Sequence, residues 1–162
     1  MLPEHILEKP IAAALHAFDA AALTGGTWYV DQLTLEVEAS RIVDVCRYLK
    51  QEQKYNRLSG ITGLDWYPME PRFEVVYFLH SMEKNERLRL KVKVSGENPE
   101  IDSVTSVYSG ANWYEREVFD LFGITFHNHP NLTRIMMPEG WEGHPLRKDY
   151  PVHGHKYDYK DE

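Results

Sequence analysis

The last third of this 162-residue chain combines closely spaced carboxylates with five of the eight histidines. Carboxylates stand close together at Glu115, Glu117 and Asp120. Downstream of them come the histidines His127, His129, His144, His153 and His155. Neighbouring carboxylates can perform acid–base catalysis, and histidine pairs can bind a metal ion. The spacing of these residues therefore decides whether the chain carries chemistry of its own.

The carboxylates lie in a segment, residues 103–122, whose apolar residues recur at helical spacing. Glu115 and Glu117 are two positions apart, so on a helix they point away from each other and cannot share one reacting atom. Arg116 and Asp120 are four apart, outside the apolar stripe, which favours a surface ion pair. The spacing therefore disfavours an active site in this helix.

Glu115 falls inside the apolar stripe of the predicted helix, where an unpaired carboxylate is costly. Two interpretations are open. The side chain lies at the edge of the stripe and reaches water, or it is partly buried and forms a salt bridge with Arg134 or Arg147 from the downstream segment.

The histidines His127 and His129, like His153 and His155, are separated by one residue, so each pair would face one side of a strand. No cysteine stands near them, since Cys46 is the one cysteine of the chain. Pro130 after the first pair and the glycine within the second indicate a turn and a mobile tail. Structural, solvent-exposed histidines are therefore expected, and a small histidine-based metal-dependent enzyme is the alternative of another class.

Residues 127–162 form a segment that cannot be a long helix or a central strand, because prolines and glycines interrupt it repeatedly. The segment still carries large side chains that are unusual in a loop, and of these Met, Trp and Arg are enriched in protein interfaces. The side chains are Ile135, Met136, Met137, Trp141, Leu146, Arg147 and Tyr150. Two alternatives are open: the strip docks across a partner, or it wraps back over its own domain. The last residues, 155–162, are polar, and we expect them to be disordered alone.

Residues 1–126 are expected to form the domain that positions this segment. The pattern predicts a helix over 3–23 that Gly25 and Gly26 end, and short strands over 27–30 and 33–37. A second helix is expected to follow, with Ser40 as its cap and apolar residues at helical spacing to Leu49. A strand is predicted over 58–67.

Residues 73–80 and 88–94 alternate apolar and polar side chains on either side of a polar turn, which predicts an antiparallel hairpin. Together with the helix over 103–122, the order favours an α+β fold. We expect a two-layer sandwich of a mainly antiparallel sheet with helices on one face, followed by the extended, Pro/Gly-rich C-terminal segment.

Composition excludes several classes of function. A net charge of −7 argues against nucleic acid as the main partner. No apolar run approaches the length of a membrane span. The N-terminus lacks the pattern of a secretory signal, and a single cysteine provides no iron–sulfur site. The chain is therefore expected in a reducing compartment.

Several motifs in the right order resemble one family, the 30 kDa subunit of respiratory complex I, which in bacteria is the C subunit of NADH–quinone oxidoreductase. Upstream these are Arg72-Phe73-Glu74-Val75-Val76-Tyr77 and Leu88-Arg89-Leu90-Lys91-Val92. Further on come Asp120-Leu121-Phe122-Gly123-Ile124, His129-Pro130-Asn131-Leu132 and the run from Trp141 to Pro151. The resemblance covers about residues 27–152. Motif or partner-interface residues are expected at Glu115, Arg116, Glu117, Asp120, His129, Arg134, Pro138, Trp141, Pro145, Leu146, Arg147, Lys148, Asp149 and Tyr150.

The resemblance implies a non-catalytic subunit in the peripheral arm of a proton-translocating NADH:quinone oxidoreductase. It implies no cofactor in this chain, with NADH, FMN, iron–sulfur clusters and quinone on other subunits. The chief partner would be the hydrogenase-large-subunit-like neighbour that helps to form the quinone site. The expected location is the cytoplasmic side of the inner membrane, or the matrix side in a eukaryote, with membrane contact only through the complex.

The chain departs from the family pattern at Thr133-Arg134, where many relatives carry two basic residues, so one charge contact is expected to be missing. The chain stops at Glu162, so we expect no fusion to the large neighbouring subunit. Related subunits serve membrane-bound hydrogenases, which makes such a complex the alternative within the same scaffold type.

Overall fold

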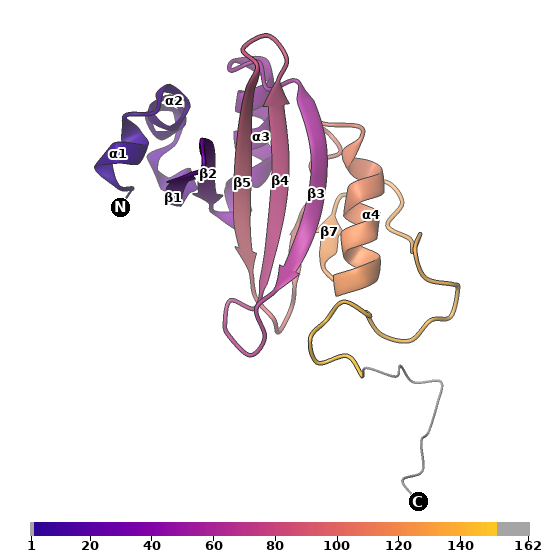
Figure 1. Cartoon of the computed structure of the whole chain (residues 1–162). Helices are drawn as coiled ribbons and strands as arrows, with labels where there is room; N and C mark the ends of the chain where they lie inside the picture. The colour runs from indigo at the N-terminus through magenta and orange to yellow at the C-terminus, as the bar shows by residue number, and fades with distance from the viewer. Residues whose placement is uncertain (1, 152–162) are drawn as a thin grey trace, which may run out of the picture.

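Figure 1 shows the chain as a computed structural model, and the structure describes residues 2–151. The predicted N-terminal helix is divided into α1 (Glu4–Leu7), α2 (Pro10–Phe18) and a 3-10 turn, η1 (Ala20–Ala22). Pro10 occupies the first position of α2, where its missing N–H costs nothing.

Strand β1 (Leu23–Tyr29) follows at once, so the prediction that Gly25 and Gly26 end the helix is wrong. Both glycines lie inside the strand, close to their neighbours. A Cβ on Gly26 would stand 3.0 Å from Ile6 Cγ2. Glycine therefore permits a close approach here rather than marking a loop.

The main sheet has five strands in the order β1-β2-β5-β4-β3. The other strands are β2 (Gln32–Val37), β3 (Arg57–Asp65), β4 (Phe73–Ser81) and β5 (Glu86–Val94). Strands β4 and β5 pair antiparallel from Phe73↔Val94 to Ser81↔Glu86, which confirms the predicted hairpin. Strand β2 runs parallel to β5, and the remaining pairs are antiparallel.

Helices α3 (Ile42–Gln51) and α4 (Ala111–Phe122) lie against the same side of the sheet. Their buried residues join the inward residues of β4 and β5 in one core. Ser40 does not cap α3: it lies in a 3-10 turn, η2 (Ala39–Arg41), and Arg41 precedes the helix without a side-chain cap. In Figure 1, α3 lies behind β4 and β5, and α4 lies beside β3. The predicted α+β fold with a mainly antiparallel sheet is confirmed.

The predicted helix over 103–122 begins too early. A two-stranded parallel sheet, β6 (Glu100–Asp102) with β7 (Thr125–His127), brackets α4 and was not expected. Residues 103–110 form turns between β6 and α4 because their polar groups are bound elsewhere. Ser103 N donates to His127 O, and Val104 N donates to the Glu115 carboxylate.

After β7, residues 128–151 continue without helix or strand and follow α4 back toward the end of β3 (Figure 1). We name this stretch the C-terminal strap. None of the helices among residues 2–151 is long and apolar enough to cross a membrane.

Candidate partner interface

Asp120 holds the beginning of the strap against α4. One carboxylate oxygen, Oδ2, accepts hydrogen bonds from the backbone N–H groups of Ile135, Met136 and Met137 at 3.0, 2.7 and 2.9 Å. The other oxygen, Oδ1, accepts one from Arg134 Nη1 at 2.7 Å. Burial by itself would raise the pKa of Asp120, but these hydrogen bonds outweigh burial and lower it. The carboxylate is fully buried, so the prediction that Asp120 lies on the exposed side of the helix is wrong.

The end of α4 provides the second attachment. Its last carbonyl oxygens have no partners within the helix. His144 Nδ1 lies 2.9 Å from Asp120 O, and Leu146 N donates to Leu121 O at 3.1 Å. Arg147 Nε donates to Phe122 O at 2.6 Å. A cation is favoured at this end by the helix dipole. The strap therefore caps the helix.

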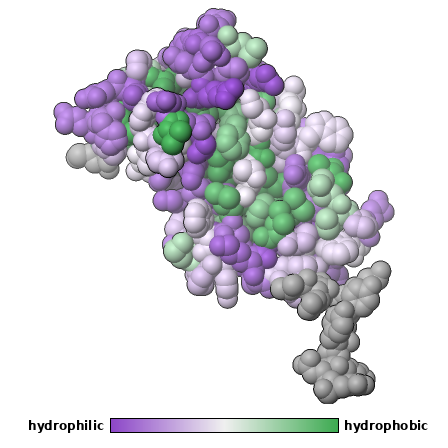
Figure 2. Space-filling model, viewed as in Figure 1, coloured by the Kyte–Doolittle hydropathy of each residue, from purple (hydrophilic) through white to green (hydrophobic). Residues whose placement is uncertain are grey.

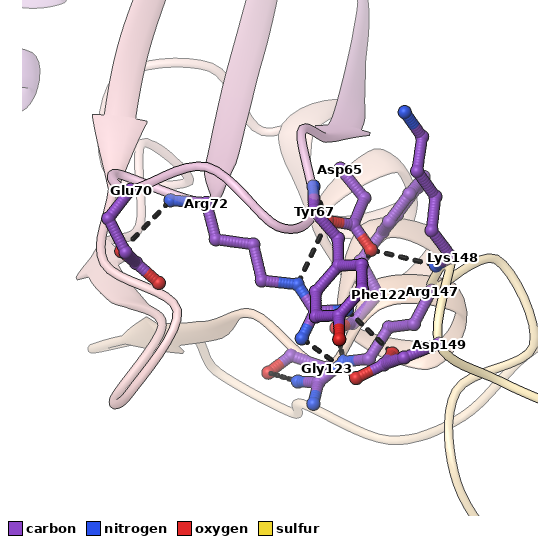
Figure 3. A network of polar contacts seen from close by, with 9 residues as sticks. All are labelled: Asp65, Tyr67, Glu70, Arg72, Phe122, Gly123, Arg147, Lys148 and Asp149. Atoms are coloured by element: carbon purple, nitrogen blue, oxygen red, sulfur yellow. Dashed lines mark hydrogen bonds and ion pairs between the residues drawn. The ribbon is translucent and has the colours of Figure 1, made fainter.

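Asp65 and Arg72, at the two ends of the β3–β4 connection, provide the third attachment (Figure 3). Arg72 bridges two carboxylates, with Nη2 at 2.8 Å from Asp65 Oδ2 and 2.6 Å from Asp149 Oδ1. Lys148 N also donates to Asp65 Oδ2 at 2.8 Å. Burial would raise the pKa of Asp65, but the bonds from Arg72, Lys148 and Tyr67 outweigh it and lower the pKa to about 2.

Glu115 has no arginine partner, so the predicted salt bridge with Arg134 or Arg147 is wrong. The Glu115 side chain is fully buried, and its carboxylate accepts from Ser103 Oγ at 2.6 Å and Val104 N at 2.8 Å. Burial raises the pKa of Glu115 to about 7, against the opposing effect of these two bonds. The alternative that Glu115 reaches water is wrong as well.

Two further contacts join α4 to the start of the strap. Arg116 donates from Nε and Nη2 to Thr133 O and Oγ1, at 3.0 and 2.9 Å, rather than pairing with Asp120. His129 Nε2 lies 3.1 Å from Asn112 O and 3.9 Å from the Glu115 carboxylate. Glu117 is half-buried on the same helix. These contacts extend the attachment of the strap over the whole length of α4.

The histidines do not form a ligand set in the described part of the chain. His127 Nε2 lies 3.0 Å from Glu100, whereas His129 and His144 bind backbone carbonyl oxygens. No group of three or more His, Cys, Asp or Glu residues within 2–151 is arranged to hold a metal ion. His153 and His155, and the polar end of the chain, lie outside the described residues.

The strap thus wraps back over its own domain, which confirms one of the two alternatives for its described residues. Contact with a partner stays a prediction, and the structure separates the side chains available for it. Arg134, Arg147 and Asp149 bind the domain. Pro138 is exposed. The exposed fractions of Met136, Trp141 and Leu146 are 55%, 36% and 52%. Pro145 and Tyr150 are half-buried, and the Lys148 residue is exposed.

Asp65 was not recognised from the sequence. It shares the side of β3 that carries the buried Ile61 and Gly63, so the alternation of the strand places a carboxylate on an inward face. An inward carboxylate requires a partner. That signal would have indicated Asp65 as a binding residue, although not which distant segment it holds.

Comparisons of the sequence and of the fold with known proteins all point to the same family. The C subunit of NADH–quinone oxidoreductase from Roseiflexus castenholzii is 48% identical over 149 residues, which is 90% of this chain and 86% of that one. Its counterpart from Geobacter sulfurreducens is 46% identical over 136 residues, 83% of this chain and 84% of that one.

Two solved structures have the same fold. A trypsin-resistant fragment of Nqo5 superposes with a TM-score of 0.66 at 31% identity, over 78% of this chain and 99% of the fragment. A chain of the membrane-bound sulfane sulfur reductase, an archaeal respiratory membrane complex, superposes with a TM-score of 0.73 at 26% identity, over 94% of both chains.

The family model described as the 30 kDa subunit of respiratory-chain NADH dehydrogenase matches residues 35–156. The resemblance seen in the sequence motifs is thereby confirmed. The chain belongs to the 30 kDa subunit family of respiratory-chain NADH dehydrogenase, complex I.

Proposed function

We propose that the chain is a non-catalytic peripheral-arm subunit of a proton-translocating NADH:quinone oxidoreductase, and that it supports assembly beside the hydrogenase-large-subunit-like, quinone-site subunit. NADH, FMN, iron–sulfur clusters and quinone belong to other subunits in this proposal. The chain lies on the cytoplasmic side of the inner membrane, or the matrix side in a eukaryote.

One observation carries the proposal. Charged side chains of the strap bind its own domain, whereas several of its large apolar side chains are exposed to solvent. Asp120 and Arg134 are paired, whereas Met136 and Leu146 are more than half exposed. A rigidly held strip with outward methionine, leucine and tryptophan side chains has the composition of a protein interface. Preorganisation of the strip lowers the entropic cost of binding. The strap therefore acts as a prepared contact surface rather than as a reaction site.

Affinity purification of the tagged chain from native membranes tests the proposal. We expect the quinone-site subunit and a flavin-bearing NADH module among the retained proteins. Recovery of the chain as a lone monomer would refute the assembly role.

The contribution of the strap is tested by Trp141→Ala in the same purification. We expect fewer retained subunits with an unchanged unfolding midpoint, because Trp141 is partly exposed and its backbone N–H binds Pro138 O within the strap rather than the domain. Trp28→Ala is the matched control, since Trp28 is similarly exposed, at 41%, on strand β1. Loss of partners in the control alone would place the contact elsewhere.

A second candidate function is the equivalent subunit of a related membrane complex, such as a membrane-bound hydrogenase. The superposition with a chain of the archaeal sulfane sulfur reductase complex favours this alternative. The two candidates differ in one retained component. Absence of a flavin-bearing NADH module, with the quinone-site-like subunit still present, would support the second.

A further inference from the structure

The face of the sheet opposite α3, which we name the outer sheet face, carries a basic hollow at one end. The hollow has a volume of about 410 Å³ and lies where β3 and β5 begin and β4 ends. Its lining includes Arg57, Arg87, Arg89, His80 and Phe78. Hydrophilic residues dominate this upper end of the molecule in Figure 2.

Strand register gathers these side chains. Arg57 pairs with His80, and His80 pairs with Arg87, so the three stand in one row across β3, β4 and β5. Paired residues point to the same face, and the neighbouring Leu79 and Leu88 are buried in the core, so this row points outward. Neighbouring strands lie about 4.8 Å apart, which places the backbones of Arg57 and Arg87 roughly 10 Å apart across β4.

The positive charge of the hollow has no counterion within residues 2–151. The side chains of Arg57 and Arg87 make no hydrogen bond or ion pair there, and no carboxylate lines the hollow. Glu86, next to Arg87, turns to the other side and binds Tyr55 Oη at 3.0 Å. The two arginines stand on either side of His80, and like charges repel each other unless something neutralises them.

Two buried nitrogen atoms at the hollow are also unsatisfied. Within residues 2–151, His80 Nε2 and the donor Arg89 Nε have no hydrogen-bond partner, although Arg89 Nη2 donates to Gln32 at 2.6 Å. The Arg89 guanidinium lies over the Phe78 ring, 5.6 Å from its centre. Buried donors without acceptors cost free energy. The hollow is thus short of acceptors as well as of negative charge.

In a second hollow that contains arginines, each arginine is paired with a carboxylate. It has a volume of about 320 Å³ and contains Arg41 and Arg47. Each of these arginines has its own carboxylate, Asp19 at 3.7 Å and Asp44 at 2.6 Å. The chain has 25 acidic residues against 18 basic ones, so the missing carboxylates at Arg57 and Arg87 are a local feature.

We propose that the basic hollow binds the carboxylates of an acidic segment of a neighbouring subunit. Guanidinium groups bind carboxylates in a bidentate manner, which supplies both the charge and the acceptors that the hollow lacks. A protein segment fits better than a small anion because the same face also carries the exposed apolar side chain of Leu64, at 37%, near the far end of β3. The inference rests on the proposed function as a subunit of a larger complex.

The test compares two double variants of the tagged chain, purified from native membranes at low and high salt. In Arg57→Gln/Arg87→Gln the hollow loses its unpaired charges. Arg41→Gln/Arg47→Gln has the same change in composition and net charge at arginines that already have partners. We expect the first variant to lose about tenfold in retention of one neighbouring subunit, and the control to match the wild type.

The outcomes separate the inference from the proposed function. Equal retention by both variants and the wild type overturns the basic hollow as an interface and leaves the proposed function intact. A wild-type chain that retains no subunit overturns both. Inorganic phosphate is titrated against the isolated full chain while the NMR signals of the His80 ring are followed. Saturable shifts at millimolar phosphate, with normal assembly of the Arg57→Gln/Arg87→Gln variant, would identify a small-anion site and overturn the protein partner.

Discussion

Asp120 shows how a single carboxylate can organise a segment that has no secondary structure. Three consecutive backbone N–H groups converge on its Oδ2 atom, in place of the partners that a strand or helix would provide. Backbone donors that are buried must be bound, and here one side chain binds all three. The Pro-interrupted strap is therefore ordered by its contact with α4 rather than by its own periodicity.

Asp120→Asn should lower the free energy of unfolding by about 3 kcal/mol, because Arg134 loses a buried anionic partner and one of the two acceptor oxygens becomes a donor. Chemical denaturation measures the change, and hydrogen exchange at Ile135 to Met137 locates it. Glu117→Gln is the control on the same helix, where a shift within about 0.5 kcal/mol is expected. Equal effects of the two substitutions would contradict the role assigned to Asp120.

Glu115 predicts a pH dependence of stability. Its pKa in the folded chain, about 7, exceeds the ordinary value of 4.5, so the protonated form favours folding. This contribution is fully present below pH 4.5 and is lost as the pH rises through 7. The difference in pKa corresponds to at most about 3 kcal/mol.

Glu115→Gln removes the titrating group while keeping a carbonyl oxygen for Val104 N–H. We expect the wild type to lose stability relative to this variant between pH 5 and pH 8. Denaturant titrations of both proteins at the two pH values measure the difference. A constant difference would mean that Glu115 has an ordinary pKa.

At the scale of elements, the end of α4 depends on one glycine. Gly123 has φ +72°, in the left-handed region, and closes the helix with its N–H bound to Phe119 O. A Cβ there would stand 2.5 Å from His144 Cδ2 and 2.6 Å from Arg147 Nη2. Glycine at this position therefore allows the left-handed turn that ends the helix, and it leaves room for His144 and Arg147 of the strap.

Gly123→Ala should destabilise the chain by about 2 kcal/mol and weaken hydrogen-exchange protection at Leu146 N. Gly110→Ala tests the opposite end of α4, where φ is −64° and a Cβ would meet nothing within 4 Å. There we expect no loss, or a gain of about 0.5 kcal/mol. A harmless Gly123→Ala would show that His144 and Arg147 are not held at this end.

Elements with a strong local pattern were predictable, and those defined by distant partners were not. The β4–β5 hairpin follows from alternation around a polar turn. The strands β6 and β7 have only three residues each, and their parallel pairing joins segments on opposite sides of α4. Within the candidate interface, the motifs indicated Asp120 and Arg147. The binding role of Asp65 depends on a contact with Lys148, far along the chain.

At the scale of the whole molecule, the strap adds a layer to a core that is nearly complete without it. The buried hydrophobic core runs from Leu2 to Phe126, and Leu132 of the strap packs against it only in part. The division into a domain of residues 1–126 and a C-terminal docking segment, residues 127–162, stays a prediction, and strand β7 crosses its boundary at His127. The strap would then cover part of the surface of the domain and add to its stability, without determining the fold.

A chain truncated after residue 126 should therefore unfold cooperatively with an intact sheet, at lower stability than the full chain. Without the strap, the Asp120 carboxylate is hydrated instead of being left buried and unpaired. We therefore expect the free energy of unfolding to fall by less, for each hydrogen bond removed, than in Asp120→Asn. Circular dichroism and denaturant titration of both lengths measure this. A truncated chain that is molten or insoluble would show that the strap is part of the domain.

The bridge through Arg72 also orders events in time. Arg72 and Asp149 are 77 residues apart, and Asp65 and Lys148 are 83 apart. During synthesis the β3–β4 hairpin leaves the ribosome long before the strap. Asp65 and Arg72 can therefore be in place before Lys148 and Asp149 are made. Contacts of such long range carry a loop-closure cost and form late. A pull on the C-terminus should accordingly release the strap before the sheet opens.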